Sequence, residues 1–251
     1  MKKLLRGHMP NTAVILAAGN GKRLGRLGKK LPKALLELDH KPIILHSIEK
    51  LRASGIDKIN VVVNRKFQKE FEFLKSNSFE LNIIVNDEFK IFGNAYSLIL
   101  GTKELQNPFL IVDADIIYEH RSLAALAQID DSDSILVSGF TNSQDEVWVC
   151  GKNQELISIS KEINDLDTLV GEYIGISKVS INFLNFLKTK IDRSPDLLKK
   201  DYEYFLNEFA QSYLVKICYV KDLIWGEIDT VEHLKRITLE IYPAILNSEM
   251  K

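Results

Sequence analysis

One segment sets the expectations for the whole chain: Ala13-Val14-Ile15-Leu16-Ala17-Ala18-Gly19-Asn20-Gly21-Lys22-Arg23-Leu24. It begins as a short, continuous apolar run, which is typical of a β-strand buried on both faces. The two glycines that follow allow the backbone to turn sharply and to approach a ligand closely. The segment therefore predicts a central strand that leads directly into a binding loop.

Further strands and helices alternate on the C-terminal side of this segment. Apolar runs predict strands, and helical spacing of apolar residues predicts helices between them. The strands are expected at 13–17, 59–63, 81–85 and 109–112, and the helices at 44–51, 67–74 and 96–104. This β-α-β order implies right-handed crossovers and a Rossmann-like, mostly parallel mixed sheet flanked by helices.

The second half of the chain has a different pattern. Short strand-like pieces are expected at 134–140, 147–150, 156–160, 171–177 and 214–220, and helices at 181–191, 201–209 and 231–246. These pieces predict a small antiparallel insertion in an α/β fold. No repeat or linker divides the chain, so we expect one domain over 12–251, and residues 1–11 are interpreted as a flexible extension or a tag remnant.

Composition excludes several classes of protein. Of the 251 residues, 45% are hydrophobic and 27% are charged, which excludes general disorder and a long coiled coil. The 33 basic and 34 acidic residues give a net charge of -1, so no nucleic-acid partner is expected. No run of ~18 apolar residues exists to span a membrane. The two cysteines, Cys150 and Cys218, cannot build a disulfide framework and lack metal-ligand spacing. A reducing compartment, the cytoplasm, is therefore expected.

The glycine loop carries the chemistry expected of a phosphate site. Consecutive backbone N–H groups in such a loop form an anion-binding nest, and Lys22, Arg23 and Lys33 add positive charge beside it. The loop is neither a Rossmann dinucleotide fingerprint, because Leu24 occupies the third glycine position, nor a Walker A loop. The alternative for Gly19 and Gly21 alone is an ordinary flexible loop with solvated cations.

The complete pattern resembles a known family. Leu-Ala-Ala-Gly-x-Gly-x-Arg-Leu at 16–24, followed by Pro-Lys-Ala-Leu at 32–35, is similar to nucleotidyltransferases that make nucleoside-diphosphate sugars and alcohols. The resemblance implies the nucleotide-diphospho-sugar transferase fold, with a nucleotide-binding half at 12–115 and an acceptor-binding half at 116–251. It also implies catalytic roles for Arg23 and Lys33 at the nucleotide phosphates. The nucleotide-binding residues it indicates are Leu16, Ala17, Ala18, Gly19, Gly21, Lys22, Gly93, Asn94 and Ser97. For Asn94 the alternative is a cap on the helix that directly follows it.

Carboxylates at two predicted loop positions indicate a magnesium site. Asp113 and Asp115 follow an apolar run, and oxygen ligands of this type suit Mg²⁺. The resemblance assigns Mg²⁺ binding to Asp115 and to Asp229, with Asp113 as a further candidate. Asp229 also reads as an ordinary acid at a helix start, where Thr230 is expected to act as the cap.

Acceptor-binding residues are expected in the second half. The resemblance places an acceptor-phosphate lysine at Lys161 and an acceptor-contacting acid at Glu172. Trp225 directly precedes the segment Gly226-Glu227-Ile228-Asp229-Thr230, which carries Asp229. An acidic pocket from Glu172 or Glu227 with an aromatic wall from Tyr173 or Trp225 would suit a cationic amine. The alternatives are a solvated lysine at 161 and core aromatic residues.

The resulting hypothesis is a Mg²⁺-dependent nucleotidyltransferase. It would transfer a nucleoside monophosphate, CMP from CTP, to a small phosphorylated or phosphonate alcohol or amine of the phosphocholine or 2-aminoethylphosphonate type, with release of pyrophosphate. The segments 94–98 and 171–177 resemble those of cytidylyltransferases acting on choline phosphate, inositol phosphate and aminoethylphosphonate. The alternatives are a sugar-1-phosphate uridylyl- or thymidylyltransferase and a non-catalytic nucleotide-binding regulator. A homo-oligomer is left open.

Overall fold

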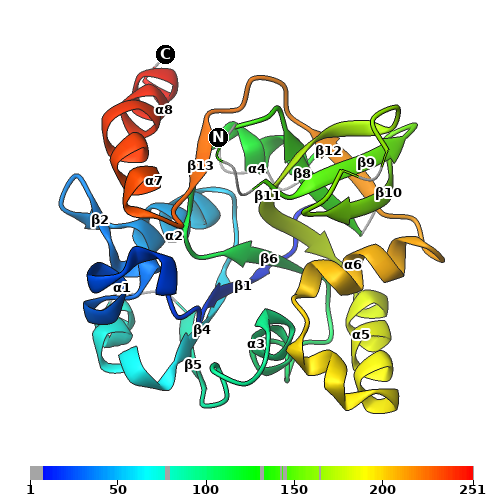
Figure 1. Ribbon diagram of the computed structural model, residues 1–251, viewed down its shortest axis with the longest axis horizontal. Helices are drawn as coiled ribbons and strands as arrows, with labels where there is room; N and C mark the ends of the chain where they lie inside the picture. The colour runs from blue at the N-terminus through cyan, green and yellow to red at the C-terminus, as the bar shows by residue number, and fades with distance from the viewer. Residues whose placement is uncertain are drawn as a thin grey trace.

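The computed structural model describes residues 8–76, 80–130, 133–141, 143, 146–163 and 165–250. Its centre is a parallel sheet, as predicted (Figure 1). Strand β1 (Thr12–Ala17) pairs in parallel with β4 (Lys58–Asn64) on one side and with β6 (Phe109–Asp113) on the other. Strand β5 (Glu80–Asn86) continues the sheet beyond β4, also in parallel. The four strands expected from apolar runs are confirmed.

The sheet continues into the second half of the chain. Strand β11 (Leu169–Val179) runs antiparallel to β6 and joins the two halves. The strands beyond it are β8 (Ser134–Ser138), β12 (Lys216–Tyr219), β10 (Glu155–Ser160) and β9 (Trp148–Lys152). The order among described residues is β5-β4-β1-β6-β11-β8-β12-β10-β9. The antiparallel portion therefore extends the same sheet, which supports the expected α/β class with an antiparallel insertion.

The two faces of β1 belong to two different hydrophobic clusters. Ala13 and Ile15 pack toward α2 (Ile43–Ala53), whereas Val14 and Leu16 pack toward α3 (Asn94–Gly101). Successive side chains of a strand point to opposite faces, so a strand between two helical layers must be apolar throughout. This is why the run at 13–17 shows no polar alternation.

The helices cover both faces and mostly confirm the expected positions. Figure 1 shows α3, α5 and α6 together, far from the C-terminal α7 and α8. The remaining helices are α1 (Arg26–Lys30), α4 (Arg121–Leu126), α5 (Ile181–Arg193), α6 (Tyr202–Ala210), α7 (Val231–Arg236) and α8 (Tyr242–Glu249). The 3₁₀ segments are η1 (Lys22–Leu24), η2 (Lys33–Leu35), η3 (Arg65–Phe67), η4 (Lys69–Ser76) and η5 (Pro195–Lys199).

Two helix predictions need correction. The helix expected at 67–74 is formed by 3₁₀ turns, η3 and η4, instead of an α-helix. The helix expected at 231–246 contains a π-helical turn, η6 (Ile237–Ile241), between α7 and α8. Ile237 and Ile241 pack directly over Gly226, where a side chain would collide with them. The π-helical turn therefore lies where this part of the chain packs against Gly226.

Two small ribbons were missing from the expectations. Strand β2 (Glu37–Leu38) pairs with β3 (Lys41–Pro42), and β7 (Ile116–Tyr118) pairs with β13 (Trp225–Glu227), both antiparallel.

Residues 1–7 of the predicted extension lie outside the described residues, whereas the His8 N–H donates to Ala127 O at 3.1 Å. Within the described ranges, no helix combines the length and apolar character that a membrane span requires.

Candidate active site

The glycine loop turns immediately after β1, as its sequence predicts. Gly21 has a φ of 57°, a left-handed conformation that favours glycine. A side chain at Gly28 would collide with the Gly21 carbonyl oxygen, so the loop also packs tightly on α1. Asn64, at the end of β4, donates its amide N–H to Ala18 O at 3.2 Å. The protein itself therefore fixes the conformation of the loop.

The ribbon of β7 and β13 brings the carboxylate of Asp115 to those of Glu227 and Asp229, more than 100 residues later in the chain. Asp115 lies in the turn between β6 and β7, and the N–H of Ile228, after β13, donates to Asp115 O at 2.9 Å. Oxygen atoms of Asp115, Glu227 and Asp229 all lie within 4.8 Å of one another. Thr230 caps α7 through its side chain, which accepts the His233 N–H at 3.2 Å. The cap expected at Thr230 is confirmed, and it holds the loop that carries Asp229.

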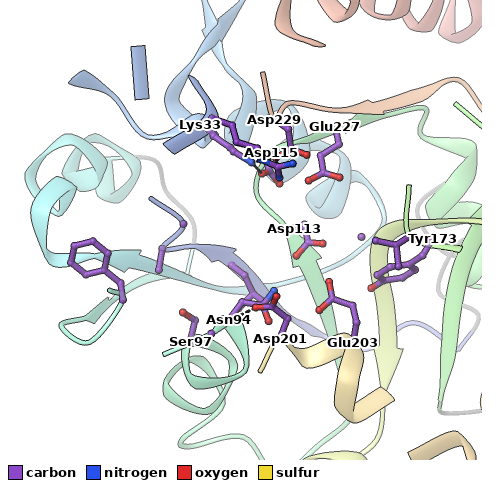
Figure 2. Close-up of a pocket in the computed structure, with 18 of the residues that line it drawn as sticks. Lys33, Asn94, Ser97, Asp113, Asp115, Tyr173, Asp201, Glu203, Glu227 and Asp229 are labelled. Atoms are coloured by element: carbon purple, nitrogen blue, oxygen red, sulfur yellow. Dashed lines mark hydrogen bonds and ion pairs between the residues drawn. The ribbon is translucent and has the colours of Figure 1, made fainter. Parts of the chain in front are cut away.

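Two basic side chains from the first half of the chain, Arg23 and Lys33, reach this acidic cluster, and Figure 2 shows Lys33 beside Asp115 and Asp229. Lys33 Nζ donates to Asp115 Oδ2 at 2.7 Å and also to Asp229 Oδ1. Arg23 Nη2 donates to the same Asp229 oxygen at 2.6 Å. Burial lowers the pKa of Lys33, but the charges of Asp115 and Asp229 outweigh it and raise the pKa above its ordinary value. Lys33 is therefore charged and serves as the counterion of the cluster.

The third carboxylate of the cluster, Glu227, has no basic side chain hydrogen-bonded to it among the contacts described above, so its negative charge is less well compensated. Burial, together with the negative charges of Asp115 and Asp229, raises the pKa of Glu227 well above its ordinary value. Removing a charge from water is unfavourable unless an opposite charge compensates it. A set of three carboxylate oxygens is the kind of ligand set that Mg²⁺ binds, completed by phosphate and water. The donor chemistry of this cluster fits that ion.

Two adjoining cavities surround the cluster, with volumes of about 350 and 370 Å³. Both are lined by Arg23, Lys33 and Asp115, so the basic and acidic groups lie where the cavities meet. The residues expected to bind nucleotide all line at least one of the two cavities: Leu16, Ala17, Ala18, Gly19, Gly21, Lys22, Gly93, Asn94 and Ser97.

Helix α3 begins with an interlocked pair of caps. The Asn94 N–H donates to Asp201 Oδ1 at 3.0 Å, and the Asn94 side chain accepts the Tyr202 N–H at 2.6 Å. Asn94 therefore caps α6, and Asp201 caps α3. A side chain at Gly93 would collide with the Lys200 carbonyl oxygen, so glycine permits this close approach. Asn94 also lines the 350 Å³ cavity, as does Ser97, whose Oγ accepts the Asn86 amide at 2.9 Å.

Tyr173 lines the 350 Å³ cavity and is hydrogen-bonded to the buried Tyr202. The hydroxyl groups of Tyr173 and Tyr202 lie 2.8 Å apart, and Tyr202 donates to Asp113 Oδ2 at 3.0 Å. Burial and the charges of Glu203 and Asp115 raise the pKa of Asp113. Gly175 has a φ of 80° and approaches Asp113 so closely that an added Cβ would lie 2.6 Å from Oδ2. Asp113 thus faces Tyr202, apart from the cluster formed by Asp115.

The predicted acceptor residues fall into three groups. Lys161 and Tyr173 line the 350 Å³ cavity. Glu227 also lines it, but the structure groups this residue with the metal candidates. Glu172 and Trp225 are not among the lining residues. Glu172 accepts hydrogen bonds from the Thr141 N–H and hydroxyl at 2.8 and 3.0 Å, and Trp225 is buried in the core.

These two placements correct the expectation for physical reasons. Glu172 and Tyr173 are neighbours on β11, so their side chains point to opposite faces, and only Tyr173 faces the cavity. Trp225 packs into the apolar cluster around β7. Sequence reasoning also missed Asp201 and Glu203, which both line the cavity. Their only signal is a pair of acids at the start of a helix, which is common without any ligand.

Comparison with known proteins gives a family and a fold that match those expected from the glycine loop and the sheet. A family model described as nucleotidyl transferase matches residues 12–147. The chain belongs to this family. Within the family, it is 27% identical over 232 residues to the bifunctional IPC transferase and DIPP synthase of Aquifex aeolicus, covering 91% of this chain and 51% of that protein. It is 38% identical over 103 residues to the choline-phosphate cytidylyltransferase of Streptococcus pneumoniae, covering 41% and 44%.

A solved structure supports the same fold. The inositol-1-phosphate CTP transferase from T. maritima superposes with a TM-score of 0.82 at 20% identity, covering 96% of this chain and 97% of that one. At this identity the likeness concerns the fold alone. The chain spans about half the length of the curated relatives it matches first. The expected nucleotide-diphospho-sugar transferase fold and nucleotidyltransferase family are thus confirmed.

Proposed function

We propose that this protein transfers a nucleoside monophosphate, CMP from CTP, to a small phosphorylated or phosphonate acceptor of the phosphocholine or 2-aminoethylphosphonate type. The supporting observation is the meeting of Lys33 and Arg23 with three carboxylates where the two cavities join. The division into a nucleotide-binding half at 12–115 and an acceptor-binding half at 116–251 is part of this proposal. The preference for CTP rests on relatives named as cytidylyl- or CTP transferases.

The reaction forms one bond and breaks one. An oxygen of the acceptor phosphate or phosphonate attacks the α-phosphorus of the nucleotide, and the bond between that phosphorus and the β-phosphate oxygen breaks. Pyrophosphate leaves with the electron pair. A phosphate monoester has its second pKa near ~6, so it is already largely a dianion at neutral pH and needs no general base. The protein therefore has to align the groups and neutralise charge.

Each side chain of the cluster has a role in this alignment. Lys33 and Arg23 would stabilise negative charge on the nucleotide phosphates, as positioned cations do in phosphoryl transfer. Asp115 and Asp229, with Glu227 beside them, would hold Mg²⁺, which supplies charge neutralisation to the two reacting phosphates. Lys161, on the acceptor side of the cavity, would bind the acceptor phosphate. A cytoplasmic location and a homo-oligomer stay predictions.

The experiment is a grid of pyrophosphate-release assays with Mg²⁺. ATP, GTP, CTP, UTP and dTTP are each tested against phosphocholine, 2-aminoethylphosphonate, inositol phosphate, glycerol phosphate and glucose-1-phosphate. Turnover with CTP and a non-sugar acceptor would support the proposal, and the Asp115→Asn variant should lose it while keeping its circular dichroism spectrum. Turnover with UTP or dTTP and a sugar phosphate would favour the sugar nucleotidyltransferase. Nucleotide binding without pyrophosphate release would favour the regulator.

A further inference from the structure

A run of positive charge extends outward from the glycine loop. Positions 22–30 carry five basic residues and no acidic one, in a chain whose net charge is -1. All five are exposed: Lys22, Arg23, Arg26, Lys29 and Lys30. Lys22 and Arg23 line the 370 Å³ cavity, whereas the three basic residues of α1 line neither of the two cavities. The reaction proposed above therefore gives Arg26, Lys29 and Lys30 no role.

The fold holds α1 beside the glycine loop and adds a further lysine to it. Gly28 of α1 packs so tightly on the loop that a Cβ there would lie 2.1 Å from the Gly21 carbonyl oxygen. The exposed Lys66, in η3, donates its Nζ to Lys29 O at 2.8 Å. Figure 1 shows α1 on the side of β4 and β5, away from α5 and α6. We define the basic rim as the residues Arg26, Lys29, Lys30 and Lys66.

The charge of the basic rim is not neutralised by neighbouring acids. Among the described residues, no carboxylate forms an ion pair with any of its four members. Basic residues near it do have such partners, since Arg65 pairs with Asp87 and Arg23 with Asp229, both at 2.6 Å. An unpaired exposed charge acts through solvent over ~10 Å at ~0.1 M salt and over ~30 Å at ~0.01 M. The basic rim therefore projects a positive potential into the solvent beside the glycine loop.

The two cavities differ in charge, which gives this potential a direction. The described residues that line the 370 Å³ cavity include three cations and one carboxylate: Lys22, Arg23, Lys33 and Asp115. Those that line the 350 Å³ cavity include three cations and six carboxylates: Arg23, Lys33, Lys161, Asp113, Asp115, Asp201, Glu203, Glu227 and Asp229. A strongly anionic molecule is thus attracted from the side of α1 and less so from the side of α6. A nucleoside triphosphate is the most anionic substrate of the proposed reaction.

We propose that the basic rim is a steering surface for the polyphosphate chain of the nucleotide, which raises the rate at which the nucleotide enters the site. This inference rests on the proposed nucleotidyl transfer. Clefts lined by one sign of charge raise association rates by about 10- to 10³-fold, and the gain falls steeply with ionic strength. Because the rim residues line neither cavity, they change the association rate constant and leave the dissociation rate constant and kcat as they are.

Stopped-flow fluorescence tests the steering directly. A CTP analogue with a fluorophore on its ribose is mixed with the protein and Mg²⁺, without any acceptor, at salt concentrations from ~0.01 to ~1 M, over which the Debye length shrinks from ~30 to ~3 Å. The triple variant Arg26→Gln/Lys29→Gln/Lys30→Gln should associate about tenfold more slowly than the wild type at low salt. The two proteins should associate equally fast at high salt and share one dissociation rate constant. Lys66 is kept because its hydrogen bond joins η3 to α1.

The matched control removes the same amount of positive charge elsewhere. Lys103, Lys152 and Lys221 are exposed and line neither cavity, so Lys103→Gln/Lys152→Gln/Lys221→Gln should keep the wild-type association rate. An equal loss in this control would make the effect one of net charge and overturn the assignment to the basic rim. A second measurement on the wild type needs no variant: the analogue of CMP, which carries fewer charges, should show a weaker salt dependence of association than the analogue of CTP, and equal salt dependences would contradict steering.

Other outcomes separate this inference from the proposed function. Faster dissociation from the rim variant with an unchanged association rate would show that the rim holds the bound nucleotide, and it would overturn steering. An unchanged association rate together with lost binding to single-stranded DNA or to anionic vesicles would assign the rim to a macromolecule instead. Nucleotidyl transfer stands in both cases. A wild type that binds no nucleotide at all would reject the proposed function itself.

Discussion

Replacing Lys33 by methionine tests the idea that this lysine is the counterion of the acidic cluster. The change keeps the length of the side chain and removes its charge. Asp229 is 1% exposed, and Lys33 and Asp115 are 17% and 19% exposed, so the bridges are largely buried. Breaking a buried pair leaves an uncompensated charge and costs about 3–5 kcal/mol. Because Arg23 remains on Asp229, we expect the lower end, about 3 kcal/mol.

The effect is measured by thermal unfolding with and without Mg²⁺. In a chain of this size, ~1 kcal/mol shifts the melting temperature by ~2–4 °C, so a loss of about 6–12 °C is expected without the ion. An ion present at ~100 times its dissociation constant stabilises a protein by about 2.7 kcal/mol. Magnesium should therefore restore most of the loss in Lys33→Met, and its effect on the wild type should be smaller, because Lys33 competes for the same carboxylates.

The matched control is Lys22→Met, which changes an exposed lysine of the glycine loop, in η1. This variant should melt at the wild-type temperature in both conditions. The reasoning is refuted if Lys33→Met is as stable as the wild type, or if Mg²⁺ stabilises the two proteins equally. Turnover of Lys33→Met should also fall by roughly 10²–10³, by analogy with the loss of one oxyanion donor.

Three further changes test separate parts of the structure. Burial raises the pKa of Glu172 from 4.5 to about 7, so the folded protein keeps a proton that the unfolded chain releases, and this residue should lower wild-type stability by up to about 3 kcal/mol between pH 4.5 and 7. In urea titrations, the unfolding free energy of Glu172→Gln should therefore gain on that of the wild type by this amount as the pH rises, whereas parallel pH curves would contradict the argument. Lys161→Ala should raise the KM of the acceptor and leave the KM of CTP unchanged in steady-state assays. A raised KM for CTP with an unchanged KM for the acceptor would instead assign Lys161 to the nucleotide. Gly93→Ala should destabilise the protein by about 1–3 kcal/mol, since the new methyl group collides with the Lys200 carbonyl oxygen; an unchanged melting temperature would show that the 198–201 turn yields freely.

The central strands and the glycine loop were predictable because their determinants are local. A run such as Ala13–Ala17 is apolar at every position, since it is buried on both faces. Glycines that turn the chain after such a run stand beside it in the sequence. Lys33 and Asp115 were predictable for a related reason, because the carboxyl ends of neighbouring parallel strands place their loops together.

The other features of the candidate site depend on contacts between residues that are distant in the sequence. The ribbon of β7 and β13 joins residues 116–118 to 225–227, and its three-residue strands carry too little pattern to be recognised. This pairing is what places Glu227 beside Asp115 and Asp229 in the carboxylate cluster. Glu203 reads as an ordinary acid in the first turn of a helix. It lines the cavity only because the fold brings the start of α6 to the end of β6, where Tyr202 donates to Asp113.

The reciprocal caps of α3 and α6 connect the two substrates mechanically. Under the proposed function Asn94 belongs to the nucleotide-binding residues, and Asp201, with which it exchanges caps, leads into α6 at the wall of the same cavity. A nucleotide that restricts the motion of α3 also restricts the turn that presents Glu203. The acceptor then meets a wall that has already lost part of its conformational entropy, and it binds with a smaller entropic penalty. We therefore expect the affinity of each substrate to increase in the presence of the other, without any large movement of the chain.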